Sequence, residues 1–105
     1  MASEQYEASA NFDLENVGPF LHQLEGRLKL GLPIDRLLAQ TRKTRVEATT
    51  EAGFTVSFRG KPIAIVYRVF MDDVDALDLY IFTSNNELTD AITREFDSFF
   101  AKHGL

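Results

Sequence analysis

The sequence contains no cysteine and only two histidines, and it has neither a long hydrophobic run nor an excess of positive charge. Without cysteine there are no disulfides, thiol nucleophiles or thiolate metal sites, which fits a reducing compartment, and we expect a cytoplasmic protein. No apolar run could span a bilayer and the N-terminal residues do not resemble a secretion signal, so we expect no membrane location and no export. A net charge of −5 argues against nucleic acid and anionic lipid as main partners.

The 105 residues suffice for one domain with one hydrophobic core. Hydrophobic residues make up 45% of the chain and charged residues 26%, which is the composition of an ordinary soluble globular protein. Residues 1–11 have no periodic apolar pattern, so we expect a mobile leader there. Residues 12–105 are then expected to form a single α+β domain.

Apolar residues at spacings of three and four predict helices at both ends of this domain. The N-terminal pattern predicts a helix over about 18–30 that Gly31 closes, followed by a short second helix from Ile34 to about Gln40. The segment from Ser84 to Glu87 has the spacing of a capping box, which predicts a helix start. The apolar stripe of the C-terminal helix follows it: Leu88, Ala91, Ile92, Phe96, Phe99 and Phe100.

Between these helices the apolar period changes to two, which predicts a four-stranded antiparallel meander. The predicted strands cover about 44–50, 54–58, 63–70 and 77–83. Gly53 and Gly60 are expected in the first two hairpin turns. The expected pairing sets Val56 opposite Ile65 and Val69 opposite Leu77, and the fourth strand lies at an edge of the sheet. The backbone of that edge would be available for pairing with another strand.

One face of this sheet collects apolar side chains from all four predicted strands. Its members are Val46, Ala48, Phe54, Val56, Phe58, Ile63, Ile65, Tyr67, Val69, Leu77, Leu79 and Ile81. Each helix is about 10 Å across and strands lie about 4.8 Å apart, so the two long helices are just sufficient to cover one face. We therefore expect both long helices on this face, and no long helix is left for the opposite one.

The opposite face is polar on the first two predicted strands and largely apolar on the last two. Its expected interface residues are Val66, Arg68, Phe70, Asp78, Tyr80 and Phe82, with Arg68 directly across from Asp78. Three partly exposed aromatic rings approach the ~300–600 Å² of the largest apolar patch on a typical monomer. The sequence therefore predicts either a homodimer or protein-partner interface, or cover by the short helix or the leader of the same chain.

We predict a small acidic protein-binding module, of adaptor or chaperone-like type, rather than an enzyme. The alternative is a small-molecule-binding protein or enzyme with a pocket near Arg68, Asp78 and Tyr80, in which Arg68 anchors an anion. No motif predicts catalytic residues, a metal site or a cofactor: neither His22 nor His103 lies in a ligand pattern, and the acidic run after Met71 lacks the features of a calcium loop. The basic segment from position 27 to 45 contains no aromatic residue, which disfavours nucleic acid.

Overall fold

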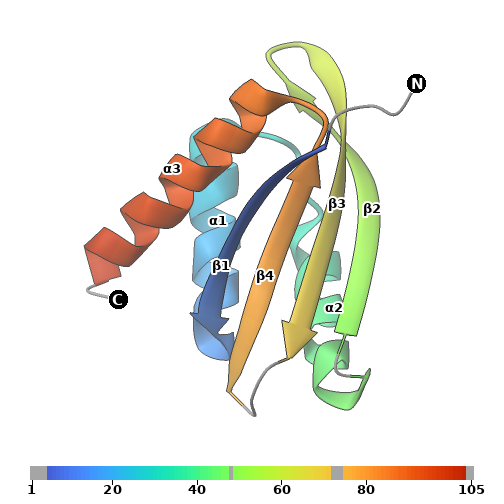
Figure 1. Cartoon of the computed structure of the whole chain (residues 1–105), viewed down its shortest axis with the longest axis vertical. Helices are drawn as coiled ribbons and strands as arrows, with labels where there is room; N and C mark the ends of the chain where they lie inside the picture. Colours follow the sequence, from blue (N-terminus) through green and yellow to red (C-terminus); the bar gives the residue numbers. More distant parts are fainter. Residues whose placement is uncertain (1–4, 48, 72–74, 104–105) are drawn as a thin grey trace.

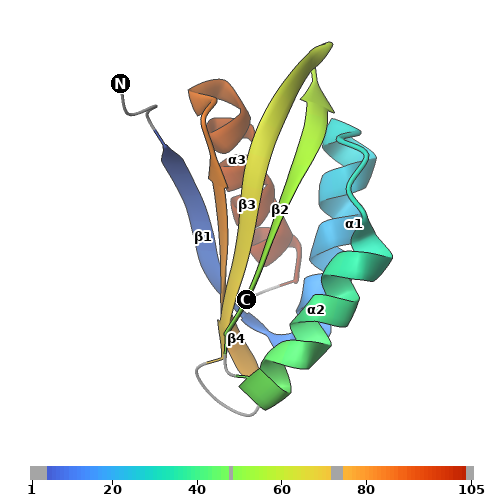
Figure 2. The same cartoon turned by 90° about the vertical axis from the view of Figure 1, so that its right-hand side faces the viewer.

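A four-stranded antiparallel sheet carries three α-helices on one of its two faces in the computed structural model (Figures 1 and 2). The structure describes residues 5–47, 49–71 and 75–103. The strands are β1 (Tyr6–Asp13), β2 (Thr49–Phe58), β3 (Lys61–Met71) and β4 (Ala76–Thr83), and their order in the sheet is β1-β4-β3-β2. The helices are α1 (Val17–Leu28), α2 (Ile34–Glu47) and α3 (Asn86–His103), and a short 3-10 helix, η1 (Leu14–Asn16), follows β1. This confirms the predicted α+β class, the antiparallel sheet and the C-terminal helix.

Strand β1 lies beside β4 at one edge of the sheet, from Tyr6 opposite Thr83 to Asp13 opposite Ala76 (Figure 1). The prediction of a mobile leader over 1–11 is therefore wrong for residues 6–11, while residues 1–4 lie outside the described part of the chain. The expectation that the fourth strand is a sheet edge is also wrong, because β4 lies between β1 and β3.

The sequence of β1 does alternate, but its signal is weak. Ala8 and Phe12 are buried and Ala10 packs against the core, while the side chains between them are exposed. Alanine carries little apolar surface, so the alternation is hard to distinguish from a polar loop. Phe12 supplies the main anchor, since its ring lies 5.1–5.9 Å from four other phenylalanine rings.

The second correction concerns residues 44–58. The sequence predicts two short strands joined at Gly53, whereas α2 continues to Glu47 and a single strand, β2, runs from Thr49 to Phe58. Val46, expected on the core face of a strand, belongs to the helix, and Ala48 lies outside the described residues. The buried side of α2 includes Thr41 as well as Leu37, so a polar residue interrupts the apolar pattern where the helix continues.

Both hairpin registers differ from the expected ones by two residues. Val56 pairs with Ile63 rather than Ile65, and Val69 pairs with Leu79 rather than Leu77. The first shift follows from the turn, because Arg59 and Gly60 both have positive φ and form the two-residue loop that suits a tight hairpin. A shift of two keeps every side chain on its predicted face, since side chains alternate with a period of two.

Side chains from the helices and from one face of all four strands form the core. The Phe20 and Phe96 rings stack with 4.5 Å between their centroids, which joins α1 to α3. The hydroxyl oxygens of Tyr67 and Thr41 lie 2.8 Å apart and join β3 to α2. Burial raises the pKa of Tyr67 to about 12, an effect that the hydrogen bond with Thr41 partly opposes.

The ends of two helices use different residues from those predicted. Helix α1 ends at Leu28, and the next residue, Lys29, takes the left-handed conformation two positions before Gly31. At the start of α3, Asn85 rather than Ser84 provides the cap, because its side-chain Oδ1 accepts the backbone N–H of Leu88 at 2.7 Å. The cap residue is therefore one position later than the capping-box pattern suggests.

Candidate functional site

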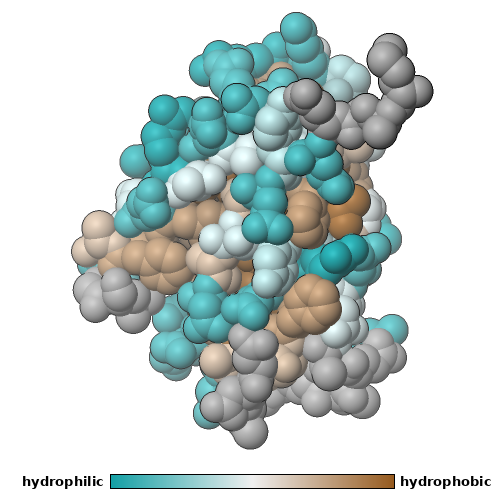
Figure 3. Space-filling view, viewed as in Figure 1, coloured by the Kyte–Doolittle hydropathy of each residue, from teal (hydrophilic) through white to brown (hydrophobic). Residues whose placement is uncertain are grey.

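The six predicted interface residues lie together on the open face, by which we mean the sheet face opposite the helices. Tyr80 on β4 is paired with Arg68 on β3, Phe82 with Val66, and Phe70 with Asp78. In Figure 3, which looks onto this face, apolar side chains gather over β3 and β4 with hydrophilic ones between and around them. The six predicted residues therefore lie next to one another on the same face of two adjacent strands, β3 and β4.

The aromatic patch, defined as Val66, Phe70, Tyr80 and Phe82, is held together by contacts among its own members. The Tyr80 and Phe82 rings stack at 6.0 Å with 4° between their planes, and Phe70 meets Tyr80 edge-on at 5.7 Å. Phe70 is 36% exposed, and the other three are half-buried. The ring contacts within the sheet contribute to this partial burial.

Arg68 is bound to Glu51 on β2, not to Asp78. Its Nε donates to Glu51 Oε2 at 2.8 Å and its NH2 lies 2.6 Å from the same oxygen. The expected pair with Asp78 is wrong because the register shift sets Tyr80 opposite Arg68. The guanidinium also lies over two rings, 5.3 Å from the centre of Phe82 and 5.9 Å from that of Phe70.

The carboxylates on the β1 side of the patch have only neutral partners among the bonds that the structure shows. Asp78 accepts a hydrogen bond from Asn11 Nδ2 at 3.1 Å, and Glu7 accepts one from Ser9 Oγ at 3.2 Å. By strand parity, the described part of this face carries four carboxylates, Glu7, Asp13, Glu51 and Asp78, against the single guanidinium of Arg68. The rim of the patch is therefore acidic.

In the described part of the chain, neither segment that could have covered this face does so. Helix α2, which contains the predicted short helix, packs on the opposite side of the sheet, where Leu37 is buried (Figure 2). The described part of the expected leader is strand β1, which extends the sheet sideways. Among the described residues, no helix lies over the aromatic patch.

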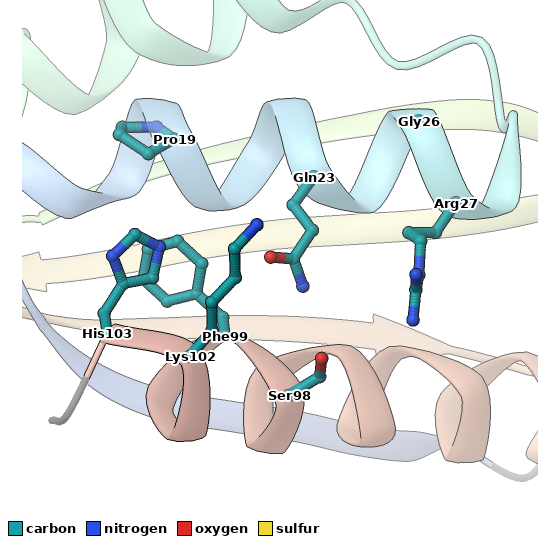
Figure 4. Close-up of a pocket in the computed structure, with 8 residues that line it drawn as sticks. All are labelled: Pro19, Gln23, Gly26, Arg27, Ser98, Phe99, Lys102 and His103. Atoms are coloured by element: carbon teal, nitrogen blue, oxygen red, sulfur yellow. The ribbon is translucent and has the colours of Figure 1, made fainter.

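A second candidate site, which the sequence did not predict, is a groove between α1 and α3 (Figure 4). It encloses about 480 Å³, and polar side chains project into it from both helices. Those polar residues are Gln23, Arg27, Ser98, Lys102 and His103. The groove adjoins Glu95, a buried glutamate within the apolar stripe of α3, and this break in the stripe is the signal that could have identified it.

The charges around this groove largely offset one another. Glu95 Oε1 accepts a hydrogen bond from Gln23 Nε2 at 3.1 Å and lies 3.4 Å from Arg27 Nε. Lys102 is in the last turn of α3, where the helix dipole is negative and balances a cation. His103 packs its ring on Phe99 at 4.2 Å. We interpret the groove as a polar seam that holds α1 against α3.

The remaining candidates from the sequence are His22 and the acidic loop after Met71. Within residues 5–47, 49–71 and 75–103, no three histidine or acidic side chains come together in a way that could hold a metal ion. A hollow of about 530 Å³ near the end of β1 is lined by Asp13, Leu14, Glu15 and Asp75. Asp72 and Asp73, the other acids of the predicted loop, lie outside the described residues. His22 is exposed on α1.

Comparison of the chain with protein-family models, curated proteins and solved structures finds no match. Among the residues that the structure describes, no helix combines the length and the apolar character that crossing a bilayer requires.

Proposed function

We propose that this protein is a small protein-binding module, of adaptor or chaperone-like type, that acts through its open sheet face. The observation that carries the proposal is the aromatic patch, which has Phe70 exposed and no helix of the described chain above it. Aromatic residues and arginine are enriched at protein interfaces, where buried aromatic rings supply a large contact area. The patch combines three aromatic rings with Arg68.

The acidic rim favours a basic segment of another protein as the occupant. Glu7 and Asp78 flank the patch with only neutral partners, so a segment with apolar and cationic side chains would match both the surface and its charge. A second copy docked face to face would bring eight carboxylates against two guanidiniums, and such juxtaposition of like charges is unfavourable. We therefore favour a heterologous basic partner over the homodimer.

The size of the open face is compatible with such a contact. Four strands spaced about 4.8 Å apart and eight residues of about 3.3 Å each give a face of roughly 500 Å² in projection. The accessible area of a corrugated surface exceeds its projection, and a standard interface uses about 800 Å² per partner. The small-molecule alternative has less support, because Arg68 already binds Glu51 and is not free to anchor an anion.

A random-peptide phage library selected against the purified protein tests the proposal. We expect enriched peptides that combine basic and apolar residues, and we expect their binding to shift the backbone amide resonances of β3 and β4. Phe82→Asp should weaken that binding at least about tenfold, as loss of a central aromatic anchor does. Thr55→Asp is the matched control, because it adds the same charge to the polar half of the same face.

Three results would overturn the proposal. The first is a selection without enrichment. The second is a set of peptides whose amide shifts map to the groove between α1 and α3. The third is equal loss of binding in Phe82→Asp and Thr55→Asp, which would show that the loss is not specific to the aromatic patch. Light scattering of the free protein is expected to give the mass of a single chain.

A further inference from the structure

The open face already contains one arginine held by aromatic rings and a carboxylate. Arg68 lies over the rings of Phe82 and Phe70, and Glu51 from the neighbouring strand β2 holds its guanidinium. A cation near the face of an aromatic ring is attracted by the ring's negative charge distribution, and a carboxylate fixes the planar guanidinium through directed hydrogen bonds. This unit occupies the β2 side of the patch.

The β1 side of the same patch offers the same groups without an arginine. Phe82 is paired with Glu7 on β1, just as Arg68 is paired with Glu51 on β2. Ser9 lies opposite Tyr80, and this short, exposed side chain leaves space beside the ring. Asp78 occupies the next position of β4 on this face and supplies a second carboxylate. Two stacked rings and two carboxylates thus border a position that Ser9 does not fill.

We propose that this position, bounded by Tyr80, Phe82, Glu7 and Asp78, binds an arginine side chain of the partner. The inference rests on the proposed function and identifies the partner's key residue. The guanidinium lies against the Tyr80 and Phe82 rings. It replaces Ser9 as the hydrogen-bond donor to Glu7, and it replaces Asn11 as the donor to Asp78. Arginine suits the position better than lysine, because its guanidinium is planar, stacks on rings and is less strongly hydrated than an ammonium group.

Three short peptides that differ at one position test the inference. Each has a central residue flanked by leucines, and that residue is arginine, lysine or citrulline, which keeps the shape of arginine without its charge. Titration followed by amide shifts of β1 and β4 should show the arginine peptide binding about tenfold more tightly than the citrulline peptide, the factor expected from a cation–π contact combined with a charged hydrogen bond. The lysine peptide should be intermediate.

Two variants separate the contribution of the Glu7 carboxylate to arginine binding from that of the Tyr80 ring. Glu7→Gln should weaken the arginine peptide about three- to tenfold and leave the citrulline peptide unchanged, because only the charged pair is lost. Asp90→Asn is the matched control, since it removes an exposed carboxylate from α3 and should change neither peptide. Tyr80→Leu keeps the patch apolar but removes one ring, and it should reduce the preference for arginine over citrulline.

Equal binding of the arginine and citrulline peptides on the open face would overturn the inference and leave the proposed function standing. Arginine binding that Asp90→Asn weakens as much as Glu7→Gln would also overturn it, because general attraction to an acidic protein would then explain the effect. If no peptide shifts the amides of β1 or β4, the inference fails, whatever the library selection shows. A doubling of mass by light scattering that the arginine peptide cannot reverse would identify a second copy as the occupant.

Discussion

The two faces of the sheet draw on the same two strands, β3 and β4, which carry apolar residues at both odd and even positions. On the core face, Val69, Leu77 and Leu79 are fully buried beneath the helices. On the open face, Phe70 contacts the ring of Tyr80, Tyr80 stacks on Phe82, and Arg68 lies over Phe70, with no helix of the described residues above them. The two faces have similar apolar content on these strands but differ in whether described helices lie above them, so the sequence pattern alone does not distinguish the buried face from the open one.

The largest expected contrast between the faces is in stability. Phe12→Ala on the core face should lower the free energy of unfolding by about 3–5 kcal/mol, because it removes a buried ring that contacts four others and leaves a cavity. Phe82→Ala on the open face should cost about 1 kcal/mol, the scale of one aromatic pair. Urea unfolding measures the free energy of unfolding of both variants. Similar losses of stability would place Phe82 in the core and contradict the distinction between the two faces.

The second contrast is a pH dependence specific to the core face. The pKa of Tyr67 is raised to about 12 when the chain is folded, whereas an unfolded tyrosine titrates near 10. Above pH 10 the unfolded chain loses this proton while the folded chain keeps it, so stability is fully present below pH 10 and falls between pH 10 and 12. The two-unit shift corresponds to about 2–3 kcal/mol.

Tyr67→Phe supplies the control for that measurement. The two proteins differ only in the phenol hydroxyl at position 67, so the difference between their urea-unfolding curves reports on Tyr67. If stability falls by the same amount from pH 10 to 12 in the variant, the buried phenol does not cause the decline.

The smallest effect is expected on the open face and has the opposite sign. Gly53 lies within β2, and a Cβ built there meets no atom within 4 Å, so Gly53→Thr should stabilise the protein by about 0.5–1 kcal/mol through strand propensity. Gly60→Thr is the matched comparison, because the positive φ of 77° at this turn makes the same change unfavourable. Thermal unfolding measures the stability of both variants. Destabilisation by Gly53→Thr would support a turn at Gly53, as the sequence predicted, over a continuous strand.

Much of the site could be predicted, because the sheet face on which a strand residue lies depends only on whether its position is odd or even. Both registers shifted by two residues, so the predicted residues stayed on one face: Val66, Arg68, Phe70, Asp78, Tyr80 and Phe82. What could not be predicted is which residues bind one another: Arg68 binds Glu51 across β2–β3, and Asp78 binds Asn11 across β1–β4. These partners depend on register and strand order, which arise from the whole core.

By itself the sequence determined the amphipathic helices α1 and α3 and the division of β3 and β4 into two faces. Both features follow from the spacing of apolar residues that are close together in the sequence. Only the tertiary structure decided that β1 is a strand, that α2 reaches Glu47 and that β4 is interior. These features depend on contacts between distant segments, such as Phe12 against the rings of α1 and α3 and Thr41 against Tyr67. A segment with weak local preference takes the structure that its distant neighbours stabilise.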